Sequence, residues 1–575
     1  MKRCPECRRD YYDDSLLYCL DDGSALLEGP RSELPASAGG QFDEPQTAIL
    51  HETASPGEAA TRTQIHATEL TAILPSAAEA EPRKSLDKPS EKQGISASKA
   101  VKPLIVAAIA VVAIVGGFFG YRYFSNFNSK KIESIAVMPF VNESGNADLE
   151  YLSDGMTESL ISSLSQVAGL SVKGRSSVFR YKGKDTDAKT IGKELGVQAI
   201  LNGRLVQRGD QLTLTLELID AQNENVLWSD TYDRLQADLV SLQTEIARDV
   251  SSKLKIKLTS ADQLKLAKRY TNDPEVYRLY LQGRYYWNKR TPAEVAKGVP
   301  FFQQAVEKDP NFALGLVGLA DSNEDNDRPR KKEYIRRALE IDDNLAEAHA
   351  SLGYQYMVDF NWPESERELK RAIDLNPNYP QAYQWNSMRL IMTGKYDEAR
   401  SSLVKALELD PTSTGINFYY GVLMFASGKT DDSIRQLKKL AEMEPSLPWT
   451  HTWLSNCYSQ QGNHAASVEE RALALEIDDR PDDARRVRES FAKGGWNGYL
   501  LEMIHQLDLH PVSSRTLRVK FLAQLGRKEE ALAELAKAND EGDFWLFTIK
   551  FDRTLDSLRD DPQFQAIVKK FDPPE

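Results

Sequence analysis

Four residues near the amino terminus have the types and spacing of a zinc site. Cys4 and Cys7 form a C-x-x-C pair, Cys19 begins a second pair, and Asp22 stands where the last thiolate of that second pair would fall. Zinc accepts thiolate sulfur and carboxylate oxygen in tetrahedral sites, so three sulfurs and one oxygen can complete its coordination. The sequence therefore predicts a zinc ion bound by these four side chains.

The stretch that holds these ligands, residues 1–29, is too short to fold by burial of apolar surface. A segment of about thirty residues either binds metal or stays disordered. Its pattern is C-P-x-C, a tyrosine-rich turn and then Tyr-Cys-x-x-Asp-Gly. This pattern resembles the short zinc ribbons that open many bacterial membrane-anchored proteins. The resemblance implies a zinc-ribbon-like amino terminus, from which Asp22 departs by replacing a cysteine.

The 575-residue sequence lacks four common catalytic and phosphate-binding motifs. The chain contains no G-x-x-x-x-G-K-[ST], G-x-G-x-x-G, H-E-x-x-H or G-x-S-x-G pattern, and its seven histidines are scattered. Those patterns cradle phosphate, hold zinc for hydrolysis or expose a nucleophile. The formal net charge of −13 argues against general nucleic-acid binding. We expect a protein that is not an enzyme and binds no nucleic acid. The alternative is an enzyme that acts through its α/β domain, with polar residues such as Asp154 or Asp230 in the active site.

An uncharged apolar run, Pro103–Tyr121, divides the chain. It has nineteen residues without a charged or amide side chain, and a segment of that length can cross a bilayer as one helix. Five lysines precede the run, whereas Arg122, Lys130 and Lys131 follow it. The side richer in lysine and arginine normally stays in the cytoplasm. We predict one transmembrane helix over 103–123 in the inner (cytoplasmic) membrane, with a cytoplasmic amino terminus and periplasmic or other extracytoplasmic carboxy-terminal domains.

Two small residues within this run could support a homodimer. Gly116 and Gly120 form a G-x-x-x-G step, which lets two membrane helices approach closely. Small residues are common in membrane spans, so a monomeric span is the alternative.

Residues 30–100 have the composition of a disordered linker. They are rich in Ala, Glu, Ser, Thr and Pro and show neither helical nor strand periodicity. The tetrapeptide Thr-Ala-Ile-Leu occurs twice, beginning at Thr47 and at Thr71. Threonine followed three places later by leucine resembles the phosphothreonine ligands of forkhead-associated domains, which implies phosphorylation sites at Thr47 and Thr71. Chance repetition in a biased segment is the alternative.

The segment after the apolar run has the pattern of an α/β domain. Four leucines between residues 212 and 218 alternate with polar residues, which is typical of a strand with one face on a core. The predicted elements are strands near 134–140, 197–207, 211–220 and 225–233, and helices near 149–167 and 238–257. We therefore predict an α/β domain with a mixed sheet over residues 132–258.

This domain resembles the TolB amino-terminal-like (FlgO-like) α/β domain, which bacteria place between a membrane anchor and tetratricopeptide repeats. The likeness rests on Ala136-Val137-x-Pro139-Phe140, Ile191-Gly192-x-x-Leu195-Gly196-Val197, Ile200-Leu201-x-Gly203, Leu218-Ile219-Asp220-Ala221 and Leu227-Trp228-Ser229-Asp230-x-Tyr232-Asp233-Arg234. The resemblance implies the fold of the domain and leaves its activity open.

From Pro274 onward the chain repeats with a period of 34 residues. Pro377, Pro411 and Pro445 keep this step, and so do Gly394, Gly428 and Gly462. The spacing places a helix stop and a turn once in each helix pair. The run resembles tetratricopeptide repeats (TPRs) and predicts an all-α solenoid over residues 270–575. Its repeats begin near 279, 313, 346, 380, 414 and 448, and residues 482–575 are irregular.

Stacked helix pairs form a superhelix with a concave groove. In the family this groove is lined by set positions of each first helix. Carried over to this chain, they fall on Tyr354, Met357, Gln384, Met388, Phe418, Trp449, Asn456 and Gln460. Met392 and Phe425 occupy similar positions and suit the core equally well. Methionine and aromatic side chains make an adaptable surface, so we expect a protein or peptide partner in the groove.

The combined prediction is a multidomain, non-enzymatic membrane scaffold or adaptor whose exported TPR groove binds a protein or peptide. The alternative is a transmembrane receptor or regulatory subunit that couples binding on the exported side to the cytoplasmic zinc ribbon. Signalling through a single helix requires dimerisation. The receptor therefore requires a dimer through Gly116 and Gly120, whereas the scaffold does not.

Overall fold

The computed structural model describes residues 132–256, 258–322, 327–510 and 514–572, and three short strands near the amino terminus. The chain divides into two compact units, Met1–Lys102 and Pro103–Glu575. In the first unit, β1 (Lys2–Arg3) pairs antiparallel with both β2 (Asp10–Tyr11) and β3 (Leu27–Glu28). The predicted zinc ligands, the linker with Thr47 and Thr71, and the predicted span with Gly116 and Gly120 lie outside the described residues.

Within the described part of the chain, no helix combines the length and the apolar character needed to cross a membrane. The same residues contain no group of three or more His, Cys, Asp or Glu side chains placed to hold a metal ion. Cys457 is a buried, free thiol.

The second unit begins with a mixed sheet of strand order β6-β4-β7-β8-β9. Its strands are β4 (Ser134–Val137), β5 (Val141–Asn142), β6 (Ser171–Val172), β7 (Ala199–Arg208), β8 (Gln211–Asp220) and β9 (Val226–Leu235). β4 pairs in parallel with β6 and β7, and β5 pairs in parallel with β7, whereas β7, β8 and β9 form an antiparallel meander. The mixed-sheet domain predicted from the sequence is therefore confirmed.

The alternation of leucines in β8 explains which face of the sheet is covered. Leu212, Leu214, Leu216 and Leu218 are fully buried, because successive strand side chains point to opposite faces. Gly203 of β7 is required by close packing, since a Cβ there would lie 2.3 Å from Cδ1 of Phe140. The helices of this domain are α2 (Glu150–Ser165), α3 (Arg175–Phe179), α4 (Ala188–Leu195), α5 (Leu239–Lys253) and α6 (Ser260–Ala267).

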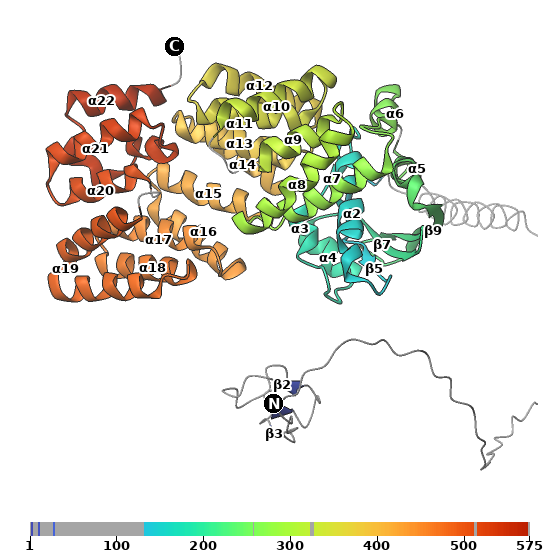
Figure 1. Cartoon of the computed structure of the whole chain (residues 1–575), viewed down its shortest axis with the longest axis horizontal. Helices are drawn as coiled ribbons and strands as arrows, with labels where there is room; N and C mark the ends of the chain where they lie inside the picture. Colours follow the sequence, from blue (N-terminus) through green and yellow to red (C-terminus); the bar gives the residue numbers. More distant parts are fainter. Residues whose placement is uncertain are drawn as a thin grey trace, which may run out of the picture. The chain divides into compact units, whose positions relative to one another are not determined.

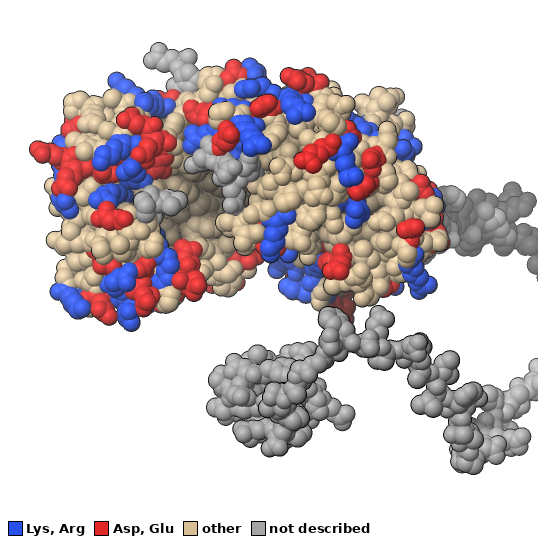
Figure 2. All heavy atoms as spheres, in the orientation of Figure 1, with Lys and Arg blue, Asp and Glu red and all other residues tan. Residues whose placement is uncertain are grey.

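The remainder of the unit is an all-helical solenoid (Figure 1). Its first part consists of antiparallel helix pairs: α7 (Pro274–Trp287) with α8 (Pro292–Lys308), α9 (Ala313–Ser322) with α10 (Arg328–Ile341), α11 (Ala346–Val358) with α12 (Trp362–Leu375), α13 (Pro380–Met392) with α14 (Tyr396–Leu409), α15 (Thr414–Ala426) with α16 (Thr430–Met443), and α17 (Pro448–Gln460) with α18 (His464–Ile477). The helical pairing predicted from the 34-residue period is confirmed. On the face drawn in Figure 2, acidic and basic side chains are interspersed over the solenoid.

One backbone position recurs in the turn inside five of the six pairs; the turn between α9 and α10 lies outside the described residues. Gly394, Gly428 and Gly462 follow the first helix of their pairs with φ of +80°, +75° and +72°. Glycine adopts this left-handed conformation without the steric penalty of a Cβ. In the first and third pairs the same place is held by Arg290 (φ +59°) and Phe360 (φ +58°).

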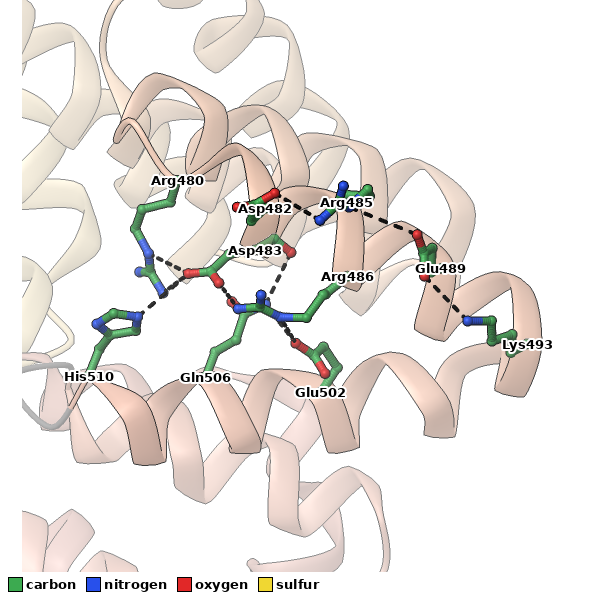
Figure 3. Close-up of polar contacts among 10 residues, drawn as sticks. All are labelled: Arg480, Asp482, Asp483, Arg485, Arg486, Glu489, Lys493, Glu502, Gln506 and His510. Atoms are coloured by element: carbon green, nitrogen blue, oxygen red, sulfur yellow. Dashed lines mark hydrogen bonds and ion pairs between the residues drawn. The ribbon is translucent and has the colours of Figure 1, made fainter.

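Helix pairing continues beyond Arg480, where the sequence period is lost. α19 (Pro481–Leu509) is two antiparallel helices that reverse at Gly495 (φ 58°, ψ −150°). Figure 3 shows the polar network that joins the two halves. The buried Asp483 accepts from Arg480 Nε at 2.7 Å and also pairs with Arg486, while Gln506 Nε2 from the second half donates to the Asp483 carbonyl at 3.1 Å. α20 (Arg515–Gln524) and α21 (Lys528–Asp540) form the next pair.

The carboxy-terminal segment, Phe544–Phe571, returns to the middle of the solenoid. It consists of η3 (Phe544–Lys550), η4 (Arg553–Leu558), α22 (Pro562–Val568) and η5 (Lys569–Phe571). The Phe571 ring lies 5.1 Å from that of Phe360, and Trp362 Nε1 donates to the Lys570 carbonyl at 2.8 Å. Phe551 and Trp545 continue the contact against Phe425 and Trp453, at ring distances of 6.0 and 5.9 Å. The segment thus shares one apolar core with helices α11 to α21.

Candidate binding chamber between the α/β domain and the solenoid

The α/β domain packs directly on the first helices of the solenoid (Figure 1). α2 contacts α7, where Tyr277 Oη donates to Ser159 Oγ at 2.6 Å. Further along, Asn378 Nδ2 donates to the carbonyls of Ser165 and Leu170 at 2.9 and 2.8 Å. These contacts join residues that are more than a hundred positions apart, so the two parts form one compact unit.

A second contact holds the start of α3 against the end of α14. The Gly174 N–H donates to the Leu409 carbonyl at 2.8 Å, and the Ser177 N–H donates to Asp410 Oδ1 at 2.8 Å. A Cβ at Gly174 would lie 2.6 Å from Asp410 Cγ, so this approach requires glycine. Burial raises the pKa of Asp410, and the hydrogen bonds from Ser177 oppose that rise.

A cavity of about 1300 Å³ lies between the two parts. Its wall combines residues of α2, α3 and α6 with residues of α7, α9, α11, α13, α15 and the start of α17. We call this cavity the interdomain chamber. Its volume exceeds the roughly 300–1,000 Å³ of typical small-molecule sites.

Aromatic side chains make up much of the solenoid wall of the chamber. Tyr280, Tyr354, Tyr379, Trp385 and Trp449 line it and are each half-buried. The Tyr354 and Trp385 rings lie 5.0 Å apart, and Trp449 packs edge-on against Phe418 at 4.3 Å. Rings held in this way present large apolar faces at little further cost in side-chain entropy.

One buried ionic cluster crosses from α2 to α7. Glu158 Oε1 accepts from Arg284 Nε at 2.9 Å, its Oε2 accepts from Asn288 Nδ2 at 2.5 Å, and Arg175 Nε lies 3.4 Å from Oε2. Burial favours the neutral acid, but Arg284 and Arg175 outweigh it, so the pKa of Glu158 is lowered. Glu158 is therefore ionised and satisfied within the protein.

Two further carboxyl groups in the chamber have raised pKa values. Burial raises the pKa of Asp321 to about 6, although a 2.7 Å hydrogen bond from Ser351 Oγ and the charge of Arg284 favour ionisation. Burial likewise raises the pKa of Glu347, whose Oε1 accepts from Ser162 Oγ at 3.4 Å. Both groups are therefore weaker acids than free carboxyl groups.

Four of the eight residues predicted to line a groove lie in the wall of this chamber: Tyr354, Gln384, Met388 and Trp449. Met388 is only 4% exposed, so it belongs to the core at the edge of the wall. Two others do not line the chamber and are core residues, since Met357 is 0% and Phe418 4% exposed. Asn456 lines a separate small pocket near α19 and α20, and Gln460 Nε2 donates to Thr430 Oγ1 at 3.4 Å.

The burial of Met357 and Phe418 corrects the assumption that every first helix faces an open groove. Met357 shares the apolar core that the carboxy-terminal segment completes, and Phe418 is covered by Trp449 and Trp453. Met392 and Phe425, which suited either role, are 1% and 2% exposed and belong to the same core. The sequence period cannot reveal that the chain covers its own concave face.

The charged residues of the chamber were missed by reasoning from the repeats. Arg284, Arg290, Asp321 and Glu347 come from the first three pairs, and Glu158 comes from the α/β domain. The sequence contained one indication of Arg290. This residue follows its first helix at the turn position that is glycine in later pairs, namely Gly394, Gly428 and Gly462.

Comparison with known proteins supports the two-part organisation. Residues 129–268 match the family described as HilA/YgeH-like transcriptional regulator, second domain, and residues 390–446 match the tetratricopeptide repeat family. The solenoid therefore contains TPRs. The family matched by the α/β domain carries a different description from the TolB-like one expected above.

One curated relative is a Rhizobium meliloti (strain 1021) protein named "Putative adenylate cyclase 3", 33% identical over 227 residues. The match covers 40% of this chain, and the chain spans about a third (33%) of that protein's length. Solved TPR structures are less similar. The thermophilic TPR protein TTC0263 of Thermus thermophilus is 16% identical (TM-score 0.29, covering 32% of this chain and 98% of that one). The pilF structure from Pseudomonas aeruginosa is also 16% identical (TM-score 0.29, 35% and 93%).

Proposed function

We propose that this chain is a non-enzymatic, single-pass membrane adaptor that binds a protein or peptide partner in the interdomain chamber. TPRs form protein-interaction scaffolds, and a chamber walled by aromatic side chains and polar groups suits an extended peptide. The observation that carries the proposal is the placement of Tyr354, Gln384, Met388 and Trp449 around one cavity of about 1300 Å³.

Photo-crosslinking in the full-length chain tests this function. A photoreactive amino acid at Trp449 should capture a defined partner from an envelope extract, because its side chain lines the chamber. The same amino acid at Leu501, which is 53% exposed on α19, is the matched control. Identical captures from the two positions, or none from Trp449, would contradict binding in the chamber.

The membrane topology is part of the proposal. The uncharged run Pro103–Tyr121 and the excess of lysine before it support one inner-membrane span over 103–123 with the amino terminus in the cytoplasm. The domain of residues 132–258, for which we retain the TolB-like resemblance, and the solenoid of residues 270–575 are then exported. Reporter fusions at Glu575 test this topology, and a fusion active only in the cytoplasm would overturn it.

The amino-terminal motif is proposed to bind zinc through Cys4, Cys7, Cys19 and Asp22. Three thiolates and one carboxylate form a donor set that zinc accepts. Elemental analysis of the purified chain should find about one zinc ion per molecule, and Cys19→Ser should lower that content. A metal-free chain with reduced thiols would contradict the assignment. The linker threonines Thr47 and Thr71 remain proposed phosphorylation sites, which phosphopeptide mapping tests.

A receptor or regulatory subunit is the second candidate. The family matched by the α/β domain is described as a transcriptional regulator, and the curated relative is named "Putative adenylate cyclase 3". Both names favour a regulatory setting. Coupling across one helix requires a homodimer through Gly116 and Gly120. Cysteine crosslinking at these positions in membranes separates the candidates, because a monomeric span excludes the receptor.

A further inference from the structure

The charge of the interdomain chamber is opposite to that of the whole chain. The chain carries a formal net charge of −13, yet the chamber wall has more cations than anions. The cations are Arg175, Arg180, Lys184, Lys265, Lys268, Arg269, Arg284, Lys289, Arg290 and Lys331, and the anions are Glu158, Asp321, Glu347, Asp410 and Glu444. A cationic cavity in an acidic protein favours an anionic ligand.

Several of these cations already have partners in the protein. Arg284 and Arg175 pair with Glu158, and Lys289 pairs with Glu294. Lys268 pairs with Asp342, which follows α10. These paired cations join the walls of the chamber. They therefore contribute to its positive electrostatic potential more than to direct contact with a ligand.

Arg290 is placed differently. Its guanidinium carbon lies 3.5 Å from the centre of the Trp287 ring. Within the described residues, no hydrogen bond or ion pair within 4 Å engages this guanidinium, and the residue lines the chamber. Burial and the neighbouring Arg284 lower the pKa of Arg290 to about 10, which leaves it charged at neutral pH. Stacking on Trp287 holds the guanidinium plane while its N–H donors stay available.

The backbone of Arg290 supports a role for its side chain. Arg290 has φ +59°, in the left-handed region, at the place where later pairs use glycine. A residue with a Cβ pays a steric cost there that glycine avoids. Phe360, another non-glycine residue at this place, uses its ring to contact Phe571. The Arg290 side chain stacks on Trp287 and lines the chamber, so contact with a bound ligand would use a side chain that glycine lacks.

We propose that the interdomain chamber binds an acidic peptide segment and that Arg290 pairs with one of its carboxylates. A planar guanidinium matches a carboxylate through two parallel hydrogen bonds. Neighbouring Tyr354, Trp385 and Trp449 provide apolar faces for the residues beside the acidic one. The chamber volume exceeds that of typical nucleotide-sized ligand sites, which favours a peptide over a nucleotide. This inference rests on the proposed function and defines the chemistry of its partner.

Paired peptides test the inference in the full-length chain. Peptides selected from a random pool on the immobilised protein are resynthesised with each Glu or Asp changed to Gln or Asn, and both forms are titrated by fluorescence anisotropy. We expect the acidic form to bind at least about tenfold more tightly at one position. Arg290→Gln should abolish that preference and leave binding of the amide form unchanged. Arg485→Gln, a change at an exposed arginine of α19, should preserve the preference.

Arg290→Gly separates recognition from folding. Glycine relieves the backbone at φ +59°, so this variant should melt at the same temperature as the wild type or higher and still lose the acidic preference. Equal binding of acidic and amide peptides to the wild type would overturn this inference and leave the proposed function standing. Failure of every peptide to bind would overturn both. Displacement of the peptides by ATP, in a manner that depends on Arg290, would identify a nucleotide site and overturn the peptide assignment.

Discussion

Asp410 Oδ1 accepts a hydrogen bond of 2.8 Å from the Ser177 N–H, and 233 positions separate the two residues. Asp410 follows α14 in the solenoid, whereas Ser177 lies in the first turn of α3 in the α/β domain. A carboxylate at the start of a helix accepts otherwise unpaired N–H groups. This contact fixes one wall of the interdomain chamber against the other.

Removal of this carboxylate should loosen the α/β domain. Asp410→Ala leaves the Ser177 N–H and hydroxyl without their acceptor, which we expect to cost about 1–3 kcal/mol of unfolding free energy. Hydrogen exchange of the α3 amides should accelerate more than exchange in α21. Glu442→Ala, at an exposed acid of α16, is the control and should change stability by less than about 0.5 kcal/mol. Unchanged exchange in α3 would show that the contact does not hold the domains together.

The carboxy-terminal segment should stabilise the middle of the solenoid. Phe571 is 0% exposed and packs against Phe360 and Trp362. Phe571→Ala leaves a cavity in this core and should cost about 3–5 kcal/mol in urea unfolding. Leu509→Ala, at a side chain that is 54% exposed, is the matched control and should be nearly neutral. Equal urea midpoints for the two variants would contradict closure of the solenoid by its own tail.

The buried pair of His349 and Glu368 predicts a pH dependence of stability. Their side chains are joined at 2.6 Å. Burial opposes protonation of His349, but Glu368 and the Asp343 carbonyl outweigh it and raise the His349 pKa above its ordinary 6.5. Burial raises the pKa of Glu368, but His349 and Arg367 outweigh it and lower that pKa below 4.5. Charged His349 thus stabilises the fold fully below pH 6.5, and this contribution is lost as pH rises through the raised value.

Urea unfolding of the wild type and of His349→Gln measures this contribution. The difference in unfolding free energy between them should be larger at about pH 6 than at about pH 9. It should also shrink in strong acid, where Glu368 becomes protonated. Glu469→Gln, at an exposed acid of α18, is the control and should show no such trend. A difference that grows with pH would contradict the charged pair.

Local patterns in the sequence predicted the elements of this protein, because the forces that select them act locally. The leucines of β8 alternate with the strand period, and Gly394, Gly428 and Gly462 mark turns that need positive φ. The chamber was not predictable in this way, since it depends on contacts such as Asn378 with Leu170, which lie 208 positions apart. No periodicity encodes such a contact.

The predicted groove residues were likewise correct only where the repeat pattern itself determines their position. Tyr354, Gln384, Met388 and Trp449 line the chamber because the first helices do turn inward. Met357 is buried because it lies in the apolar core that the carboxy-terminal segment completes, and that segment lies outside the repeat period. Arg290 was overlooked because the consensus for its position is a turn glycine and not a binding residue.

The proposed function depends most on binding of the partner in the interdomain chamber. Isothermal titration of the captured partner into the full-length chain tests it directly, with Trp449→Ala and Gln384→Ala in the wall and Leu501→Ala on the outer surface. We expect at least about a tenfold loss of affinity for each wall variant, as for residues at the centre of an interface, and no change for Leu501→Ala. Affinities equal to the wild type in both wall variants would contradict the chamber as the binding site.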